Sequence, residues 1–316
     1  MMLTDRLKAT IFGAKAAAKQ RTEYVIERLT DPEAIRPLLE GQRAYAAYAL
    51  AYLEPRLFPY SEWWQAHGPQ GQAIVAHTRS GLGPALVTIG DPQALDALIR
   101  LHPGPRFTFA TFQLDHLDVA QRHFVLSRPE PSLRMSVSAE TFRPAQGTAR
   151  RLRRQDIGAV NALQRADGFA FYSAAVLDEG VYHGVFVGRT LVAMAGTHVV
   201  APSQGLALVG NVMTHSRYRG QGYGSIATSA VTAELLKTCP DVLLTVSTKN
   251  QAAIRIYERL GYREKCRLIE SGARRKDMLG VAALLRRVLA RCRAEAGKEV
   301  VVLDQQTEGK APEGGQ

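Results

Sequence analysis

Residues 219–225 read Arg-Gly-Gln-Gly-Tyr-Gly-Ser and lie between an apolar strand expected at 206–214 and a helix expected at 225–237. Three glycines at alternate positions let the backbone turn tightly and come close to a ligand. The first N–H groups of the following helix have no partner within that helix and carry a partial positive charge. The stretch therefore predicts an anion site suited to a pyrophosphate, although a plain glycine-rich turn would have the same letters.

Two other phosphate-binding patterns do not fit this chain. A P-loop needs Gly-Lys-Ser/Thr after its glycines, and the sequence contains no such triplet. A dinucleotide-binding loop needs a third glycine where Ser225 stands, and an acidic residue at the end of the next strand. That strand runs Thr245-Val246-Ser247 instead. Both patterns are excluded.

A second motif follows at 250–262, which reads Asn-Gln-Ala-Ala-Ile-Arg-Ile-Tyr-Glu-Arg-Leu-Gly-Tyr. Asn250 is well suited to cap the start of a helix. Ala253 and Tyr257 fall on one stripe of that helix, so a phenol can reach a cleft between two splayed strands. The alternative is a core tyrosine whose hydroxyl is already hydrogen-bonded.

The second half alternates strands and helices. We expect strands at 149–154, 181–187, 191–200, 206–214, 242–247 and 262–270, with helices at 155–165, 225–237 and 250–260. The first half predicts a helix to about residue 19, a helix at 34–53 and short strands at 73–77, 85–89 and 107–112. The fold class is α/β (α+β), a mixed sheet with helices packed on it.

On the two motifs, residues 149–270 resemble the GCN5-related N-acetyltransferase (GNAT) superfamily. Its acyl-CoA loop Arg-x-x-Gly-x-Gly matches Arg219, Gly222 and Gly224, and its helix motif matches Asn250, Ala253, Tyr257, Gly261 and Tyr262. Ser216 departs from the family, because many members have proline after the fourth strand. The resemblance implies acetyl-CoA as co-substrate and no metal.

The family's roles can be carried over position by position. The strand end would pair with the pantetheine arm, the loop N–H groups would bind the pyrophosphate, Asn250 would bond the pantetheine, and Tyr257 would protonate the departing thiolate. The implied cofactor-binding residues are Val212, Met213, Thr214, Arg219, Gly220, Gln221, Gly222, Tyr223, Gly224, Ser225, Asn250, Ala253 and Tyr257.

The sequence does not decide which residue acts as the general base. Strand 206–212 has no carboxylate where many relatives keep a catalytic glutamate. The candidates are His198, His215 and Glu179, or Asn211 holding a water, and a histidine in a strand is often simply packed. The predicted catalytic set is Tyr257, Asn211 and His198.

The first half has no comparable loop. Residues 85–92 read Ala-Leu-Val-Thr-Ile-Gly-Asp-Pro, and Asp91 would repel a pyrophosphate, so we predict no cofactor there. Tyr48–Pro55 and the Arg134-Met135 pair resemble the degenerate GNAT-like domain that precedes the working domain in tandem members. The resemblance implies that this domain walls the acceptor cleft or holds the halves together, and a plain stabilising domain is the alternative.

The sequence divides into five segments. We expect an N-terminal helical extension at 1–22, a smaller degenerate GNAT-like domain at 23–145, the catalytic domain at 149–272, an amphipathic helix at 277–296 and a disordered tail at 297–316. The helix carries a stripe of Val281, Leu284, Leu285, Val288 and Cys292. We expect the stripe to dock on the body, with subunit pairing or an anionic surface as alternatives.

Charge and composition limit the classes of binding partner that we expect. Residues 1–150 carry 17 basic and 14 acidic side chains, net +3, and residues 151–316 carry 23 and 15, net +8. This excess suits coenzyme A, nucleic acid or simply a solvated surface. Nucleic acid is not expected because no aromatic residues interleave with the arginines. No apolar run could span a bilayer, no secretory signal is visible, and three separated cysteines favour a reducing cytoplasm.

Three functions remain open. The leading prediction is an N-acetyltransferase that moves acetyl from acetyl-CoA to a small-molecule primary amine by direct attack in a ternary complex. The alternatives are a protein-modifying acetyltransferase and a non-catalytic acyl-CoA-binding regulatory module. A homodimer is left open.

Overall fold

The computed structural model describes residues 21–79, 83–166, 172–292 and 298–304. The first half contains β1 (Arg21–Leu29), α2 (Pro32–Glu40), α3 (Ala47–Ala51), β2 (Ser61–Gly68), β3 (Gly71–Thr78), β4 (Ala85–Gly90), α4 (Pro92–Leu101), β5 (Phe107–Phe112), α5 (Leu117–His123) and β6 (Phe124–Val137). The second half contains β7 (Arg150–Arg151), α6 (Ile157–Ala166), α7 (Ala175–Glu179), β8 (His183–Val187), β9 (Thr190–Ala201), β10 (Leu206–Thr214), α8 (Tyr223–Leu235), β11 (Asp241–Ser247), α9 (Gln251–Arg259) and β12 (Arg263–Arg275), followed by α10 (Val281–Arg291) and β13 (Glu299–Asp304).

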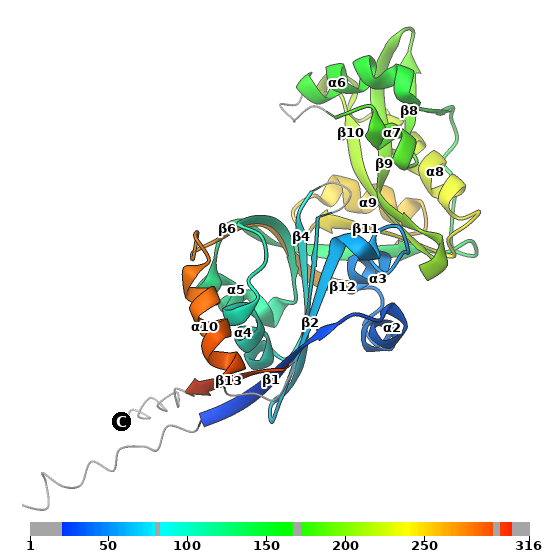
Figure 1. Ribbon diagram of the computed structural model, residues 1–316. Coiled ribbons are helices and arrows are strands. Elements are labelled where there is room, and N and C mark those ends of the chain that lie inside the picture. The colour runs from blue at the N-terminus through cyan, green and yellow to red at the C-terminus, as the bar shows by residue number, and fades with distance from the viewer. Residues whose placement is uncertain (1–20, 80–82, 167–171, 293–297, 305–316) are drawn as a thin grey trace, which may run out of the picture.

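All the described strands join one mixed sheet, in the order β13-β1-β2-β3-β4-β5-β12-β6-β11-β10-β9-β8-β7 (Figure 1). Each half has one parallel pair, β4 with β5 and β10 with β11, connected through α4 and α8 respectively. The other pairs are antiparallel. The prediction of a mixed α/β sheet with flanking helices is confirmed.

The two halves exchange their last strands. β6 of the first half pairs with β11, while β12 of the second half pairs with β5, and the two exchanged strands pair with each other. Each half therefore completes its sheet with a strand from the other half. The register between β6 and β12 runs from Arg263 opposite Ser136 to Arg275 opposite Phe124, so the junction is long.

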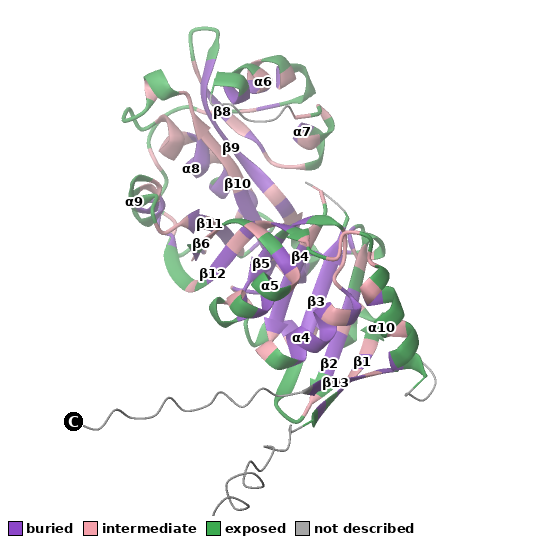
Figure 2. Ribbon diagram, turned by 90° about the vertical axis from the view of Figure 1, so that its left-hand side faces the viewer, coloured by how far each residue is buried: buried purple, intermediate pink, exposed green. Residues whose placement is uncertain are grey.

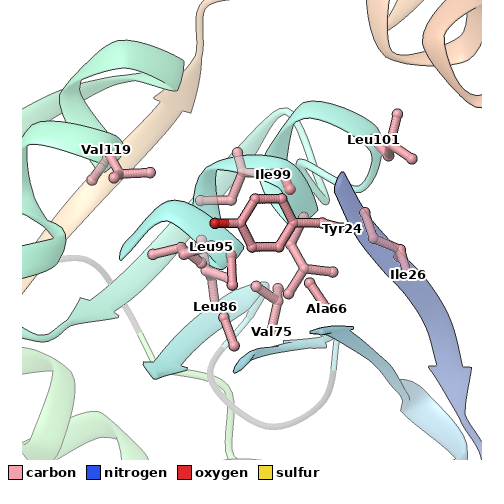
Figure 3. Packing of buried hydrophobic residues seen from close by; sticks show 14 of the residues in the cluster. Tyr24, Ile26, Ala66, Val75, Leu86, Leu95, Ile99, Leu101 and Val119 are labelled. Atoms are coloured by element: carbon pink, nitrogen blue, oxygen red, sulfur yellow. The ribbon is translucent and has the colours of Figure 1, made fainter. Parts of the chain in front are cut away.

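Each half has its own hydrophobic core, and a further core contains residues of both halves. In the first half Tyr24, Val75, Leu86 and Leu95 pack between α4 and the sheet (Figure 3). In the second half Val231 of α8 packs in a cluster with residues of β9, β10 and β11. On the other face α3 packs on β9 and β10, in a cluster that also contains residues of β3 and β4. Burial at this joint fixes α3 beside the second half.

Some expected elements are wrong in extent. The helix expected at 34–53 is two helices, α2 and α3, because the chain turns after Gly41. Arg43 in this turn bonds Asp241 at 2.8 Å and the Gln204 carbonyl at 2.7 Å, which ties the turn to the second half. The strand expected at 149–154 is reduced to two residues, because Asp156 accepts from the Arg153 N–H and ends the extended run.

The predicted tail at 297–316 is corrected in its first part. Residues 299–304 form β13, an edge strand that pairs with β1. Its Glu299 is buried and bonds His102 at 2.6 Å and Arg291 at 2.9 Å, so a segment that looked polar is anchored by an ion-pair cluster. The helix expected before residue 20, and residues 305–316, lie outside the described residues. None of the described helices has the length and apolarity needed to cross a bilayer.

The docking expected for the stripe of α10 is also wrong. Val281, Leu284, Leu285 and Val288 are each more than half exposed, and Cys292 is exposed as well. The buried residues of the helix are Ala283 and Ala290. The helix therefore packs through its small side chains, because these let it approach α4 and β13 closely.

Candidate active site

The parallel strands β10 and β11 separate halfway along their length. Their pairing covers only Leu206–Val209 against Asp241–Leu244. Beyond it, β11 continues on β6 to Ser247, while β10 continues on β9 to Thr214. The edge of β10 from Gly210 onward therefore faces an opening with no strand partner there in the described part of the chain. An extended chain carrying amide groups could pair with this edge.

Two β-bulges lie at the start of this opening. On β9, Val199 pairs with Leu208 and Thr197 pairs with Val209, so His198 is the extra residue. On β10 the register shifts between Gly210 and Met213, around Asn211, whose φ is 54°. Bulges redirect side chains and interrupt pairing, and they are common beside active sites.

The loop after β10 leaves space in front of its backbone. Gly220 and Gly222 have φ of 80° and 82°, and a Cβ added to either would meet no atom within 4 Å. Gly222 precedes α8, and no side chain in the described structure caps the N-terminus of that helix. Arg219 Nε donates to the Thr214 carbonyl at 3.1 Å and closes the base of the loop. Glycines with positive φ, open space and uncapped helix donors fit a diphosphate.

The equivalent region of the first half is filled by the chain itself. Asp91 Oδ1 accepts from the N–H groups of Gln93 and Ala94, both at 2.9 Å, at the start of α4. Gln113 Oε1 accepts from the Gly90 N–H at 2.7 Å. His116 Nε2 bonds the Gly90 carbonyl at 2.8 Å. Asp91 thus caps the start of α4, whereas no described side chain caps the start of α8.

Tyr257 lies on α9, directly after the open end of β11. Its ring is buried, with 7% exposure, and stacks edge-to-face with Tyr262 at 6.0 Å between centroids. Tyr262 shares a hydrogen bond with Thr232 at 2.7 Å, whereas the Tyr257 hydroxyl has no partner among the described residues. Burial raises the pKa of Tyr257 to about 12, so the hydroxyl stays protonated at neutral pH. Asn250 caps α9 by accepting from the Ala253 N–H at 3.1 Å.

A cavity of about 400 Å³ lies between the halves. Tyr48 of α3 and Tyr52 directly after it line the cavity together with Thr111 of β5, and the second half contributes Glu179 and His198. The volume is that of a small-molecule site, and the lining is mostly apolar and aromatic. A site of this kind at the junction of two halves can select a ligand by shape.

Comparison with known proteins identifies this architecture. The FR47-like protein family model matches residues 182–269. A Drosophila protein of known structure aligns with 78% of this chain and 98% of its own length, at 13% identity and a TM-score of 0.56. A GCN5-related N-acetyltransferase from Sphaerobacter thermophilus aligns with 80% of this chain and 95% of its own, at 14% identity and a TM-score of 0.50. A search of curated protein sequences gives no significant match.

The chain is a tandem GNAT-fold protein. Its second half carries the open strand edge and the glycine loop. Its first half repeats the same β-α-β arrangement without that loop, and side chains bond the end of β4 and the start of α4. The resemblance drawn from the two sequence motifs is confirmed at the level of the fold.

His198 joins the cavity of this GNAT-fold protein to the opening between β10 and β11. Its Nε2 lies against Gly210, where an added Cβ would collide with the imidazole. Its Nδ1 bonds the Tyr48 hydroxyl at 2.5 Å. Burial, and next the positive charge of Arg134, lower the pKa of His198 to about 4. The imidazole is therefore neutral at pH 7 and can accept a proton.

The other base candidates are placed differently. Asn211 accepts from the Tyr172 hydroxyl and donates to the Tyr182 hydroxyl at 3.0 Å, so its side chain secures the bulge. His215 lies at the start of the glycine loop, where its Nδ1 accepts from the Arg217 N–H at 3.2 Å. Glu179 is exposed and lines the same cavity as His198. The structure therefore brings together His198 and Glu179 but not His215.

Sequence reasoning missed a buried polar cluster beside His198. Arg134 of β6 has no exposed surface, and its guanidinium packs over the Tyr48 ring at 4.9 Å. It lies 3.6 Å from Glu270 Oε1, and burial raises the pKa of that carboxyl. Thr245 Oγ1 donates to Glu270 at 3.0 Å. Tyr48 and His198 are 150 residues apart, and no local sequence pattern could pair them.

No group of three or more metal-ligating side chains lies close enough to hold an ion within the described ranges.

Proposed function

We propose that this GNAT-fold protein is an N-acetyltransferase that moves an acetyl group from acetyl-CoA to the primary amine of a small molecule. One observation carries the proposal. His198 lines the cavity and also lies against Gly210, where the free edge of β10 begins. An amine in the cavity and a thioester along β10 would thus meet at this side chain.

Binding of the co-substrate is proposed to use backbone groups. The edge from Val212 to Thr214 would pair with the pantetheine arm, and the N–H groups of residues 220–225 would hold the diphosphate. Open space at Gly220 and Gly222 supports this assignment, because any side chain there would fill it. The thioester supplies the activated acetyl group, and the chain supplies position, donors and a base.

The pKa of His198 decides which proton it can take. A base with a pKa of about 4 cannot deprotonate a free ammonium group efficiently, because the ammonium group has a much higher pKa than the imidazolium that would form. It can take the much more acidic proton that the nitrogen carries once it has attacked. We therefore propose that the acceptor arrives as a neutral amine and that His198 Nε2 removes the proton after attack.

Tyr48 would set the tautomer of His198. If Nδ1–H donates to the Tyr48 oxygen, the Nε2 lone pair faces the β10 bulge. Tyr257 is proposed to protonate the departing sulfur. Its hydroxyl is protonated at neutral pH and has no partner among the described residues, which supports that role. Backbone N–H groups at the β10 bulge would stabilise the developing oxyanion.

A small acceptor fits better than a protein. The cavity holds about 400 Å³ and is walled by α3 on the side of the first half. Two measurements test the proposal: calorimetry with acetyl-CoA and longer acyl-CoAs, and release of free thiol with a panel of primary amines. Absence of binding heat would end the acyl-CoA assignment, and binding without thiol release from any amine would leave a non-catalytic module.

A further inference from the structure

Helix α10 presents its bulky apolar side chains to solvent. Val281, Leu284, Leu285, Val288 and Leu289 on the helix and Leu279 just before it are between 52% and 86% exposed, and we call these six residues the α10 face. They make up half of the twelve large hydrophobic residues that are exposed in the described structure. Figure 2 shows the outer side of α10 as exposed. Concentration of such residues on one element marks an interaction site, whereas scattered ones do not.

The rotation of α10 is fixed by contacts on its other side. Ala283 and Ala290 are buried in the packing with α4 and β13. Asp277 accepts from the N–H groups of Gly280 and Ala283, at 2.9 and 3.1 Å, and holds the start of the helix. Arg291 Nε donates to Glu299 at 2.9 Å and holds its end. The outward direction of the α10 face is therefore built into the fold.

The charges on and just before the helix are mostly basic, and its acidic neighbours Asp277 and Glu299 are engaged at the two ends. Helix α10 contains three arginines and no acidic residue. At 100° per residue, Arg286 lies beyond one edge of the apolar stripe, and Arg287 and Arg291 lie beyond the other. Arg274 and Lys276, both exposed, precede the helix. Pairing with a second copy of α10 would bring these cations together without acidic partners on the helix, which is unfavourable.

We propose that α10 binds the anionic surface of a lipid bilayer, with the α10 face in the boundary between headgroups and acyl chains. Aliphatic residues on one side and the exposed Arg286 beyond one edge suit this position, because an arginine stem can lie along apolar surface while its guanidinium group reaches phosphates. Arg274 and Lys276 add exposed cations just before the helix. A bilayer also requires no complementary shape. Protein hot spots favour aromatic anchors, and the α10 face has none.

The experiment uses the full chain and sedimentation with vesicles. One set contains phosphatidylcholine with about 30% phosphatidylglycerol, and the other contains phosphatidylcholine alone. We expect the chain to pellet with the anionic vesicles at low salt, and to bind at least about tenfold more weakly to neutral vesicles or at high salt. The double variant Leu284→Ser/Leu285→Ser should lose about tenfold in binding, and Arg286→Gln should lose less.

Val187→Ser is the matched control, since Val187 is also an exposed apolar residue but lies on β8. It should bind as the wild type does. All variants should keep the wild-type melting temperature, because the replaced side chains are exposed. Equal binding to both vesicle types, no binding to either, or unchanged binding of the double variant would overturn the proposal. A dimer in light scattering that the double variant converts to a monomer, without vesicle binding, would assign the face to a second copy. These outcomes do not depend on acetyl transfer.

Discussion

Replacement of Tyr257 by phenylalanine separates the catalytic role proposed for this residue from its packing role. The ring is buried, but its hydroxyl has no partner in the described structure, so Tyr257→Phe breaks no hydrogen bond. We expect the free energy of unfolding to change by less than about 0.5 kcal/mol. Loss of a general acid typically slows a reaction by about 10²-fold or more, which corresponds to about 2.7 kcal/mol in the barrier. Affinity for coenzyme A should remain close to that of the wild type.

Tyr262→Phe provides the matched control in the same cluster. It removes the 2.7 Å hydrogen bond with Thr232 in a fully buried site, so it should cost about 1 to 2 kcal/mol of stability. Its turnover should be unchanged. Urea unfolding and a thiol-release assay at saturating acetyl-CoA measure the two effects on each variant. Wild-type turnover in Tyr257→Phe, or an equal loss in both variants, would refute the acid role.

Three further predictions follow from the same structure. Gly222→Val should abolish coenzyme A binding in calorimetry. Gly188 also has positive φ and open space but lies in the β8–β9 turn, so Gly188→Val should only cost about 1 to 3 kcal/mol of stability. Coenzyme A binding by Gly222→Val would count against the diphosphate site. Tyr48→Phe should slow turnover about tenfold and alter the acid limb of the pH–rate profile, whereas Tyr52→Phe in the same cavity should not; identical profiles would remove Tyr48 from the mechanism. Burial lowers the pKa of His77 and of His198 in the folded protein to about 4, so the unfolded chain binds more protons than the folded protein below pH 6.5. The free energy of unfolding should therefore fall from pH 6.5 towards pH 4 by about 2 to 3 kcal/mol for each group. A urea midpoint that stays constant over that range would contradict the burial argument.

Local features of the site could be predicted from the sequence. The glycine loop follows from conformational freedom at Gly220 and Gly222, which both have positive φ. The start of α9 follows from Asn250, whose side chain makes the expected cap. Strand β10 has the predicted bounds, because its apolar run ends at the loop. Each of these depends on residues that are close in sequence, where propensity and capping operate.

Other features depend on contacts between distant segments. The bond between Tyr48 and His198 and the packing of Arg134 on Tyr48 join segments 86 to 150 residues apart. The outward stripe of α10 has the periodicity of a docked helix, and only its contacts through Ala283 and Ala290 show which side faces the body. Periodicity identifies an apolar face but not its partner.

Because of the strand exchange, the first half contributes residues to the candidate site and does not merely pack beside it. β6 lies between β11 and β12, so Arg134 enters the sheet of the second half on a strand of the first. Arg134 is buried under Tyr48, and its charge helps to keep His198 neutral. Removal of the first half would thus remove a strand next to β11, a wall of the cavity and the partner of His198 Nδ1 together. The first half has no glycine loop at the end of β4, yet the geometry around His198 in the second half depends on it.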